Sequence, residues 1–206
     1  MLVPVDIKKV GRPPSNENQR EVILNSAAEL FARKGFDGAS ISDLAAAISQ
    51  SKAAVYHYFP NKRQLCDAII VQALATLVPR TQEQVSQASD AREQLRLFML
   101  CHADQFETNR FGIITMLSGF DAMPESKTKQ QANRLRDEHE ALLRQIIRNG
   151  IDQQVFSPMD VSMAGRAVLS MLNWMARWYR PEGRLSARQI AAQYYEIICQ
   201  GFVARS

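Results

Sequence analysis

The residues best suited to chemistry lie in one short stretch, ISQSKAAVYHYFPNK, at residues 48–62. Three consecutive aromatic rings stand there with a lysine on either side: Lys52, Tyr56, His57, Tyr58 and Lys62. A helix that only filled a core would not contain three such rings in a row, because successive residues of a helix point in different directions. Lysine binds phosphate groups, and tyrosine and histidine form hydrogen bonds. The stretch therefore predicts a helix that touches a flat, polar and anionic partner.

Residue patterns for catalysis and metal binding are absent from the sequence. The nearest approach to a thiol–base pair joins Cys101 to His102 or His139, but Cys101 and His102 are adjacent, and on a helix their side chains point about 100° apart. No Gly-rich phosphate loop, nucleophile elbow or HExxH occurs. The three cysteines have no metal-binding spacing: Cys66, Cys101 and Cys199. We therefore expect no catalytic residues, no metal site, no cofactor and reduced thiols.

The composition is that of an ordinary globular protein, with 46% hydrophobic and 22% charged residues among 206. No apolar run approaches the roughly 18 residues of a membrane span, and no signal peptide is recognisable, so we expect a cytoplasmic protein without a membrane partner. Residues 1–63 contain nine Lys/Arg and six Asp/Glu, whereas the remainder contains sixteen and fifteen. This distribution favours a polyanionic partner at the N-terminal end.

Helical periodicity recurs along almost the whole chain, and strand patterns are nearly absent. Residues 17–78 are expected to form four short helices, in which Gly35 ends the first, Asn61 caps the fourth and Pro79 stops it. A polar loop is expected over 81–91, with Asp90 capping the next helix. Further helices are predicted over about 90–109, 110–120, 126–149 with Gly150 as the stop, 157–180, and 186–202 with Ser186 as the cap.

Residues 40–59 contain two short helices separated by about four residues, which is the spacing of a helix-turn-helix. On a 3.6-residue period, one face of the second helix, residues 51–58, is directed outward and another inward. The outward residues are Lys52, Ala53, Tyr56 and His57, and the inward ones are Val55, Tyr58 and Phe59. The outward set suits phosphates, base edges and thymine methyl groups.

The stretches ELFARKGF, SISDLA and SKAAVYHYFPNKRQL, in register between residues 27 and 65, resemble the DNA-binding domain of TetR-type transcriptional repressors. The resemblance implies that Tyr56 and Lys62 clamp phosphates and that Ser42 contacts another. It also implies that Lys52, Ala53 and His57 face base edges. The turn carries Ser49 where the family usually has glycine, so either a left-handed backbone at that serine or a slightly different turn is expected.

The stretch KKVGRPPS, residues 8–15, is similar to Gly-Arg-Pro hooks that enter A·T-rich minor grooves, and it equally fits a disordered tail. The candidate DNA-binding residues are Arg12, Ser40, Ser42, Lys52, Ala53, Tyr56, His57 and Lys62. The expected organisation is a flexible basic arm (1–16), a helix-turn-helix domain (17–77) and a C-terminal domain for ligand binding and dimerisation (78–206). The predicted fold class is thus all-α, with helix 4 joining an N-terminal three-helix unit to a C-terminal helical bundle.

The C-terminal half contains more apolar surface than one helix face needs. Trp174 and Trp178 lie one turn apart within 164–178, and 190–202 is similarly apolar, which fits either a homodimer interface or monomer core. An aromatic and Met-rich set predicts a pocket for a largely apolar effector, and plain bundle core is its alternative. The candidate pocket residues are Phe98, Cys101, His102, Phe106, Phe111, Met116, Phe120 and Trp174.

The closing stretch NWMARWYRPEGRLSARQIAAQY is similar to the tail of family members that sense acyl-CoA thioesters or related lipid metabolites. It implies that Arg177, Arg180 and Arg184 meet a CoA phosphate, although arginines near a helix C-terminus are also favourable for the helix dipole. The function predicted overall is a homodimeric repressor that binds a palindromic operator in double-stranded DNA and is released by a small molecule. The alternatives are an enzyme and a ligand-binding bundle without a DNA role.

Overall fold

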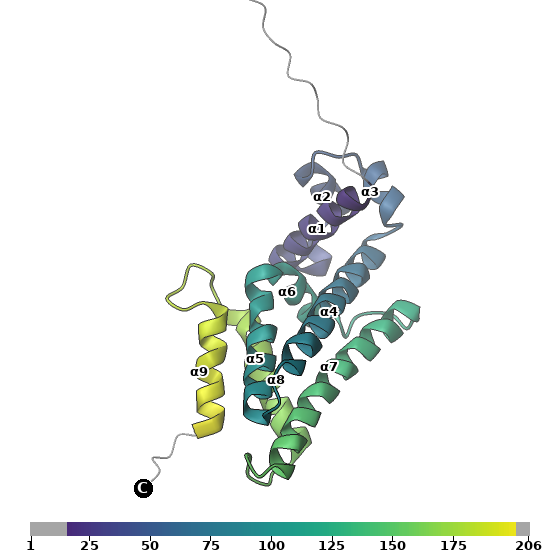
Figure 1. Ribbon diagram of the computed structural model, residues 1–206. Coiled ribbons are helices and arrows are strands. Elements are labelled where there is room, and N and C mark those ends of the chain that lie inside the picture. The colour runs from purple at the N-terminus through teal and green to yellow at the C-terminus, as the bar shows by residue number, and fades with distance from the viewer. Residues whose placement is uncertain (1–15, 201–206) are drawn as a thin grey trace, which may run out of the picture.

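The computed structural model describes residues 16–200, and within that range the chain consists of nine α-helices without a strand (Figure 1). Three helices form a small N-terminal unit: α1 (Asn16–Gly38), α2 (Ile41–Ala47) and α3 (Lys52–Tyr58). From this unit α4 (Lys62–Ser86) leads into a bundle with α5 (Ala91–Thr108), α6 (Arg110–Gly119), α7 (Lys127–Asp152), α8 (Val161–Trp178) and α9 (Ala187–Gln200). The predicted all-α fold is confirmed. None of the helices between residues 16 and 200 is long and apolar enough to cross a membrane.

The helices of the N-terminal unit begin and end where local side chains and backbone angles require it. Ser40, Ser51 and Asn61 accept hydrogen bonds from the backbone N–H three residues later and so cap α2, α3 and α4. Near the end of α1, Gly35 has φ 74° and ψ 168°, which breaks the helical geometry. Glycine takes that angle without steric cost, so the expected break at this residue is confirmed.

Pro79 does not end α4, contrary to the prediction, and the expected loop over 81–91 is helical as far as Ser86. A proline inside a helix removes one backbone hydrogen bond and costs about 3 kcal/mol. Burial compensates here, because Leu77 and Val78 before the proline and Val85 after it are buried in the core. Asp90 caps α5 as predicted, accepting from the N–H groups of the first turn at 2.9 and 3.2 Å.

Gly150 does not end α7 either. It is buried inside the helix, and a Cβ atom on it would lie 2.1 Å from the Phe156 ring. The left-handed residue that ends the helix is Gln154, with φ 58°. Beyond it, the N–H groups of Val155 and Phe156 both donate to the Gly150 carbonyl at 2.9 Å. The glycine is therefore needed for close packing against Phe156, which the sequence pattern did not reveal.

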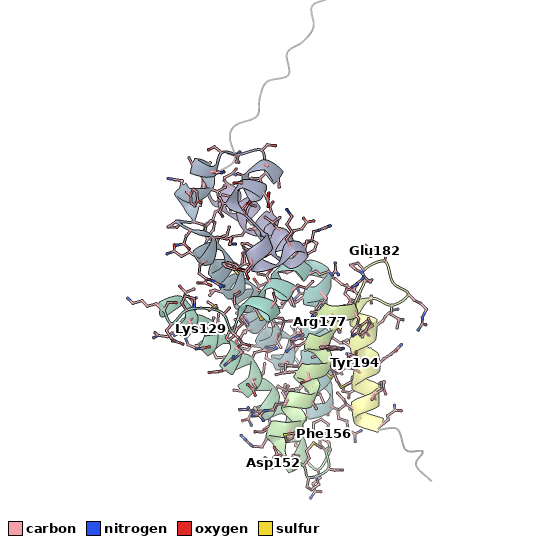
Figure 2. All side chains as sticks on the ribbon, turned by 180° about the vertical axis from the view of Figure 1, so that it is seen from behind. Lys129, Asp152, Phe156, Arg177, Glu182 and Tyr194 are labelled. Atoms are coloured by element: carbon pink, nitrogen blue, oxygen red, sulfur yellow. The ribbon has the colours of Figure 1, made fainter. Side chains whose placement is uncertain are left out.

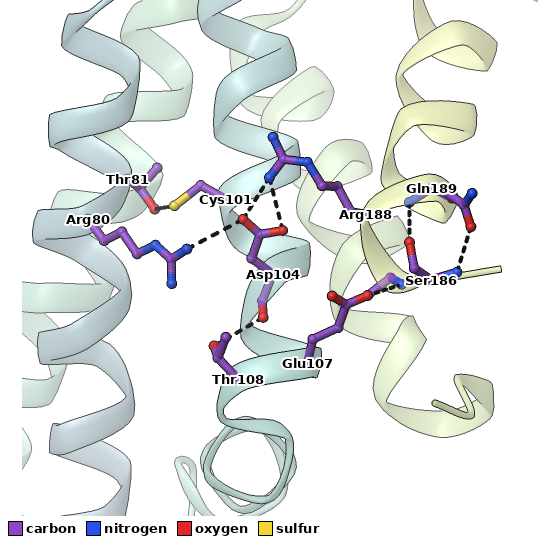
Figure 3. A network of polar contacts seen from close by, with 10 residues as sticks. Arg80, Thr81, Cys101, Asp104, Glu107, Thr108, Ser186, Arg188 and Gln189 are labelled. Atoms are coloured by element: carbon purple, nitrogen blue, oxygen red, sulfur yellow. Dashed lines mark hydrogen bonds and ion pairs between the residues drawn. The ribbon is translucent and has the colours of Figure 1, made fainter. Parts of the chain in front are cut away.

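A polar network joins three helices of the bundle (Figure 3). Arg188 of α9 donates to both carboxylate oxygens of Asp104 on α5, at 2.8 and 3.1 Å, and Arg80 of α4 lies 3.6 Å from the same carboxylate. Glu107 of α5 accepts from the N–H of Ala187 at 2.8 Å. Ser186 caps α9 as predicted by accepting from the N–H of Gln189, whose side chain accepts in return from the N–H of Ser186. The start of α9 is thereby held against α5.

Candidate nucleic-acid interface and ligand site

Helix α3 is anchored on one side and open on the other. Val55 and Phe59 are buried, and the guanidinium of Arg20 lies 5.2 Å from the centre of the Phe59 ring. On the opposite side Lys52, Ala53, Tyr56 and His57 are exposed, and 47% of the Tyr56 surface is accessible. Tyr58 is half-buried, and the edge of its ring meets His57 with the centroids 5.2 Å apart. The helix thus presents one cation, two hydrogen-bonding rings and a methyl group to solvent.

The angle between α2 and α3 depends on a tight turn. Ser49 has φ 53°, so the expected left-handed backbone at this position is confirmed. The N–H of the next residue, Gln50, donates to the Ala45 carbonyl at 2.9 Å and closes the end of α2. Lys34 of α1 lies 3.1 Å from Asp43 of α2, and its ammonium lowers the pKa of that carboxyl group. The first contact shapes the turn that leads to α3, and the second joins α2 to α1.

The other candidate DNA-binding residues differ in their exposure and in their hydrogen bonds. Ser40 is exposed, and its hydroxyl oxygen accepts from the N–H of Asp43 at 3.1 Å. Ser42 is exposed in the first turn of α2. Lys62 is half-buried, and its ammonium donates to the carbonyl oxygens of Phe36 at 2.7 Å and Ala39 at 3.0 Å. Lys62 thus has an internal role that its sequence position did not indicate. Arg12, in the expected arm, lies outside the described residues.

The candidate pocket residues lie on α5, on or directly after α6, and on α8, and they differ in exposure. Phe98, Cys101, His102 and Phe106 are buried along α5. Met116 and Phe120 are buried at α6. The charged groups of Lys129 and Arg136 lie 3.9 and 4.5 Å from the centre of the Phe120 ring. Phe111 is half-buried beside Arg33 of α1. Trp174 is 62% exposed, so in this structure it does not line the interior as the prediction required. It lies on the side of α8 away from the buried Leu172 and Met175.

Two histidines meet in the centre of the bundle, a pairing that helical periodicity did not predict. The Nδ1 atom of His102 lies 3.2 Å from Nε2 of His139 on α7, and the Phe98 ring stacks on His139 with the centroids 4.5 Å apart. Burial lowers the pKa of His102 to about 4, with the Asn173 side chain acting in the opposite direction. Burial, followed by the neighbouring His102, lowers the pKa of His139 to about 3. Both rings are therefore neutral at pH 7.

Gln105 is a further polar residue of this region that the sequence reading missed. It is completely buried, and neither its amide nitrogen nor its amide oxygen has a hydrogen-bonding partner among the described residues. The ring nitrogens Nε2 of His102 and Nδ1 of His139 make no hydrogen bond of good geometry either, although the Asn173 side chain of α8 lies beside His102. The signal in the sequence was the three-residue spacing of His102 and Gln105, which places both on one side of a helix.

Cys101 does not pair with a histidine. Its sulfur accepts from the Thr81 hydroxyl at 3.5 Å, and burial raises the pKa of the thiol, so the reactive thiolate is disfavoured. Among the described residues, no group of three or more His, Cys, Asp or Glu side chains is placed to hold a metal ion. The thiol–base pair considered as a route to catalysis is therefore not formed.

An apolar surface, called here the apolar surface of α8 and α9, is formed by the outward side of α8 and the C-terminal end of α9, and both helices face the viewer in Figure 2. Its large exposed side chains are Met163, Trp174, Trp178 and Ile198. Met163, Trp174 and Trp178 recur at helical spacing on one side of α8, and the guanidinium of Arg177 lies 5.8 Å from the Trp174 ring centre. Exposed apolar surface of this kind marks an interaction site.

Comparison with known proteins agrees with both halves of the structure. Residues 23–69 match the family "Bacterial regulatory proteins, tetR family", and residues 88–202 match "Tetracyclin repressor-like, C-terminal domain". The HTH-type transcriptional repressor KstR2 of Mycolicibacterium smegmatis is 25% identical, with 92% of this chain and 93% of KstR2 covered.

Two solved structures have the same fold. The TetR family transcriptional regulator PfmR from Thermus thermophilus is 43% identical, with 88% of this chain and 99% of that chain covered and a TM-score of 0.82. AibR, in complex with isovaleryl coenzyme A and operator DNA, is 25% identical, with 87% and 97% covered and a TM-score of 0.78. The two matched domains together span most of the described chain, and an exposed recognition helix lies at its N-terminal end. This protein therefore belongs to the TetR family of DNA-binding transcriptional regulators.

Proposed function

We propose that this protein is a homodimeric repressor that binds a palindromic operator and is released from it by a small-molecule effector. The observation that carries the proposal is the arrangement of α3, which turns Lys52, Tyr56 and His57 to solvent while buried Val55 anchors its other side. A short helix presented in this way fits the major groove of B-form DNA.

The exposed side chains have separate tasks in this proposal. Tyr56 binds a phosphate and sets the position of the helix, as does Ser42 at the start of α2. Lys52 and His57 face base edges, and the Ala53 methyl group contacts a thymine methyl. Ser40 and Arg12 remain candidate contacts. Lys62 retains one N–H for a phosphate, because two of its three are directed to the carbonyls of Phe36 and Ala39.

A twofold partner is needed because each subunit has a single recognition helix. The apolar surface of α8 and α9 supplies the contact area, and large aromatic side chains such as Trp174 and Trp178 typically dominate interface energies. Two copies joined through this surface would place their α3 helices in successive major grooves, about 34–36 Å apart or a multiple of it. This assigns residues 17–77 to DNA binding and 78–206 to dimerisation and effector binding.

For the effector we propose a CoA thioester. The support is the isovaleryl coenzyme A bound by AibR, together with the apolar interior around Phe98 and Phe106. The candidates for the CoA phosphates are Arg177, Arg180 and Arg184, which are all exposed. A ligand among the bundle helices would move α4, which belongs to both halves, and α6, which packs on α1 and α4. It would release the operator only if it bound the two arrangements with different affinity.

We further propose that the protein has no catalytic activity and acts in the cytoplasm, where chromosomal DNA is accessible. Cys101, the thiol considered as a nucleophile, is buried against Thr81 and its pKa is raised. A Cys101→Ala variant is accordingly expected to retain operator binding.

Selection of bound duplexes from random DNA, followed by measurement of affinity against salt concentration, tests the DNA-binding role. The selected duplexes should contain two inverted half-sites. Tyr56→Ala should weaken binding to all sequences to a similar extent, whereas Lys52→Ala should change the preferred bases. The matched control is Lys127→Ala, which removes an exposed lysine from α7, outside the helix-turn-helix. Equal retention of DNA by wild type, Tyr56→Ala and Lys52→Ala would favour a ligand-binding bundle that does not use α3.

A further inference from the structure

Unpaired polar atoms are concentrated at one place in the bundle. Six buried side-chain nitrogen and oxygen atoms in the described part of the chain have no hydrogen-bonding partner, and four of them belong to His102, Gln105 and His139. A buried polar atom without a partner destabilises a folded protein, so native structures contain few of them. We call these three residues the central polar cluster.

Other buried polar side chains of this protein do have partners. Thr115 donates to the Ala28 carbonyl at 3.2 Å, Thr81 to the Leu77 carbonyl at 2.8 Å, and Lys129 to the Phe120 carbonyl at 2.6 Å. The central polar cluster is therefore exceptional within its own structure. A cluster kept unsatisfied in this way is explained if its partner is a ligand that arrives later.

The hydrogen-bonding capacity of the cluster follows from the contact between the two rings. A neutral imidazole has one donor nitrogen and one acceptor nitrogen. The contact of Nδ1 of His102 with Nε2 of His139 uses one donor and one acceptor, whichever ring donates. One of the two free nitrogens must then donate and the other accept. The Gln105 amide adds one donor group and one acceptor, so donors and acceptors are balanced.

Such a balanced set suits a neutral polar group and not an anion. A carboxylate or phosphate offers only acceptors, so it would face the acceptor atoms of the cluster without a compensating cation. The surroundings are mostly apolar: Phe98 stacks on His139, and the polar side chain of Asn173 lies beside His102. Of a CoA thioester, the acyl group and the adjoining amide group fit such an environment, because the amide is neutral and offers both an N–H donor and a C=O acceptor. The charged nucleotide would have to stay near solvent.

We propose that His102, Gln105 and His139 are the specificity-determining residues of the effector site, and that they bind the neutral amide group nearest the thioester of a CoA thioester, through its N–H and its C=O, and discriminate against the free carboxylate. The inference rests on the proposed function, since it names which atoms of the protein recognise the effector class. It assigns the neutral group next to the acyl chain of the ligand to the α5–α7 contact.

The test begins with wild-type protein and four probes: acetyl-CoA, isovaleryl-CoA, octanoyl-CoA and palmitoyl-CoA. The thioester that binds most tightly in calorimetry is then compared with its free carboxylate, and we expect the thioester to bind at least tenfold more tightly. If none of the four thioesters binds, the proposed effector class is wrong and this inference falls with it. That result is seen before any variant is made, so it cannot be confused with failure of the cluster itself.

The decisive variant is Gln105→Met, which keeps the length of the side chain and removes its polar atoms. We expect it to bind the thioester at least fivefold more weakly, while the melting temperature of the ligand-free protein stays equal or rises, because an unpaired buried amide has been removed. Thr115→Val is the matched control: it removes a buried group that has a partner, so it should lower the melting temperature. If Gln105→Met does not fold, Gln105→Leu is measured in its place.

The proposal requires that Gln105→Met both binds the thioester more weakly and keeps or raises the melting temperature of the ligand-free protein. Unchanged thioester affinity would show that the amide does not contact the effector. A melting temperature lowered to the same extent as in Thr115→Val would show that the amide is satisfied as part of the fold. Either outcome overturns the proposal.

Discussion

The ammonium nitrogen of Lys62 lies 2.7 Å from the carbonyl oxygen of Phe36 and 4.4 Å from the centre of the Phe36 ring. This contact ties the first residue of α4 to the end of α1, and a second bond to Ala39 secures the connection that leads to α2. A residue that resembles a phosphate contact therefore also holds the DNA-binding unit together.

We expect Lys62→Met to lower the free energy of unfolding by about 1–3 kcal/mol, because two buried carbonyl groups lose a charged donor. Urea denaturation at constant pH measures this, with Lys127→Met as an exposed control. If Lys62 also binds a phosphate, the slope of log affinity against log salt should fall by about one in DNA binding. Unchanged stability with a reduced slope would contradict the internal role.

Replacing Ser49 by glycine should stabilise the protein by about 0.5–1 kcal/mol. The serine has φ 53°, a left-handed angle at which its Cβ atom is crowded and glycine is not. Thermal unfolding measures the change. Gln50→Gly is the neighbouring control and should destabilise, because glycine there only increases the freedom of the unfolded chain. A lower melting temperature for Ser49→Gly would argue that the serine side chain is itself required at the turn.

Stability should decrease as the pH falls from 6.5 towards 4. The pKa values of His102 and His139 are lowered to about 4 and about 3 in the folded protein, whereas unfolded histidine titrates near 6.5. Between these values the unfolded state binds more protons, so acid favours unfolding and the stabilisation is complete only above the unfolded pKa. Between pH 6.5 and pH 5 the loss should be up to about 2 kcal/mol per histidine.

Urea denaturation at several pH values measures this dependence. Replacing both His102 and His139 by leucine removes the two buried titrating groups and should flatten the curve over this range. A curve of unchanged slope in the double variant would show that other groups cause the loss of stability in acid.

Serine substitution of Trp174 or Trp178 should weaken the proposed dimer at least tenfold while changing the stability of the separate subunit little. Both side chains are largely exposed in the single chain, at 62% and 42%, so their removal leaves no cavity there. Sedimentation equilibrium measures the dissociation constant. Val22→Ser, at an exposed apolar residue of α1, is the control. Unchanged association in both tryptophan variants would place the dimer interface elsewhere.

Gly150→Ala should destabilise the protein by about 1–3 kcal/mol, because its Cβ atom would lie 2.1 Å from the Phe156 ring. Gly38→Ala is a suitable control, since a Cβ atom there would meet only the Lys34 Cβ atom, at an ordinary 3.7 Å. Chemical denaturation of the two variants separates the effects. If Gly150→Ala unfolded at the wild-type denaturant concentration, Phe156 would have to be free to move away from α7.

The features that could be predicted from the sequence are those set within three or four residues. Asn61, Asp90 and Ser186 each cap the helix that follows them, because the side chain and the N–H group it binds are close in the chain. The periodicity of α3 likewise placed Val55 inward and Tyr56 outward. The left-handed backbone at Ser49, with φ 53°, was expected from the resemblance alone, because the serine stands where the family usually has glycine.

The features of the fold that the sequence did not predict depend on contacts between segments that are distant in the chain. Pro79 lies inside α4 because buried neighbours on both sides hold the helix, and local propensity alone would have ended it there. His102 meets His139 across 37 positions of sequence, and Lys62 meets Phe36 across 26. Trp174 is exposed because Leu172 and Met175 occupy the inner side of α8. Such outcomes depend on which faces of different helices pack together, and that free energy is a property of the assembled fold and not of any short stretch of sequence.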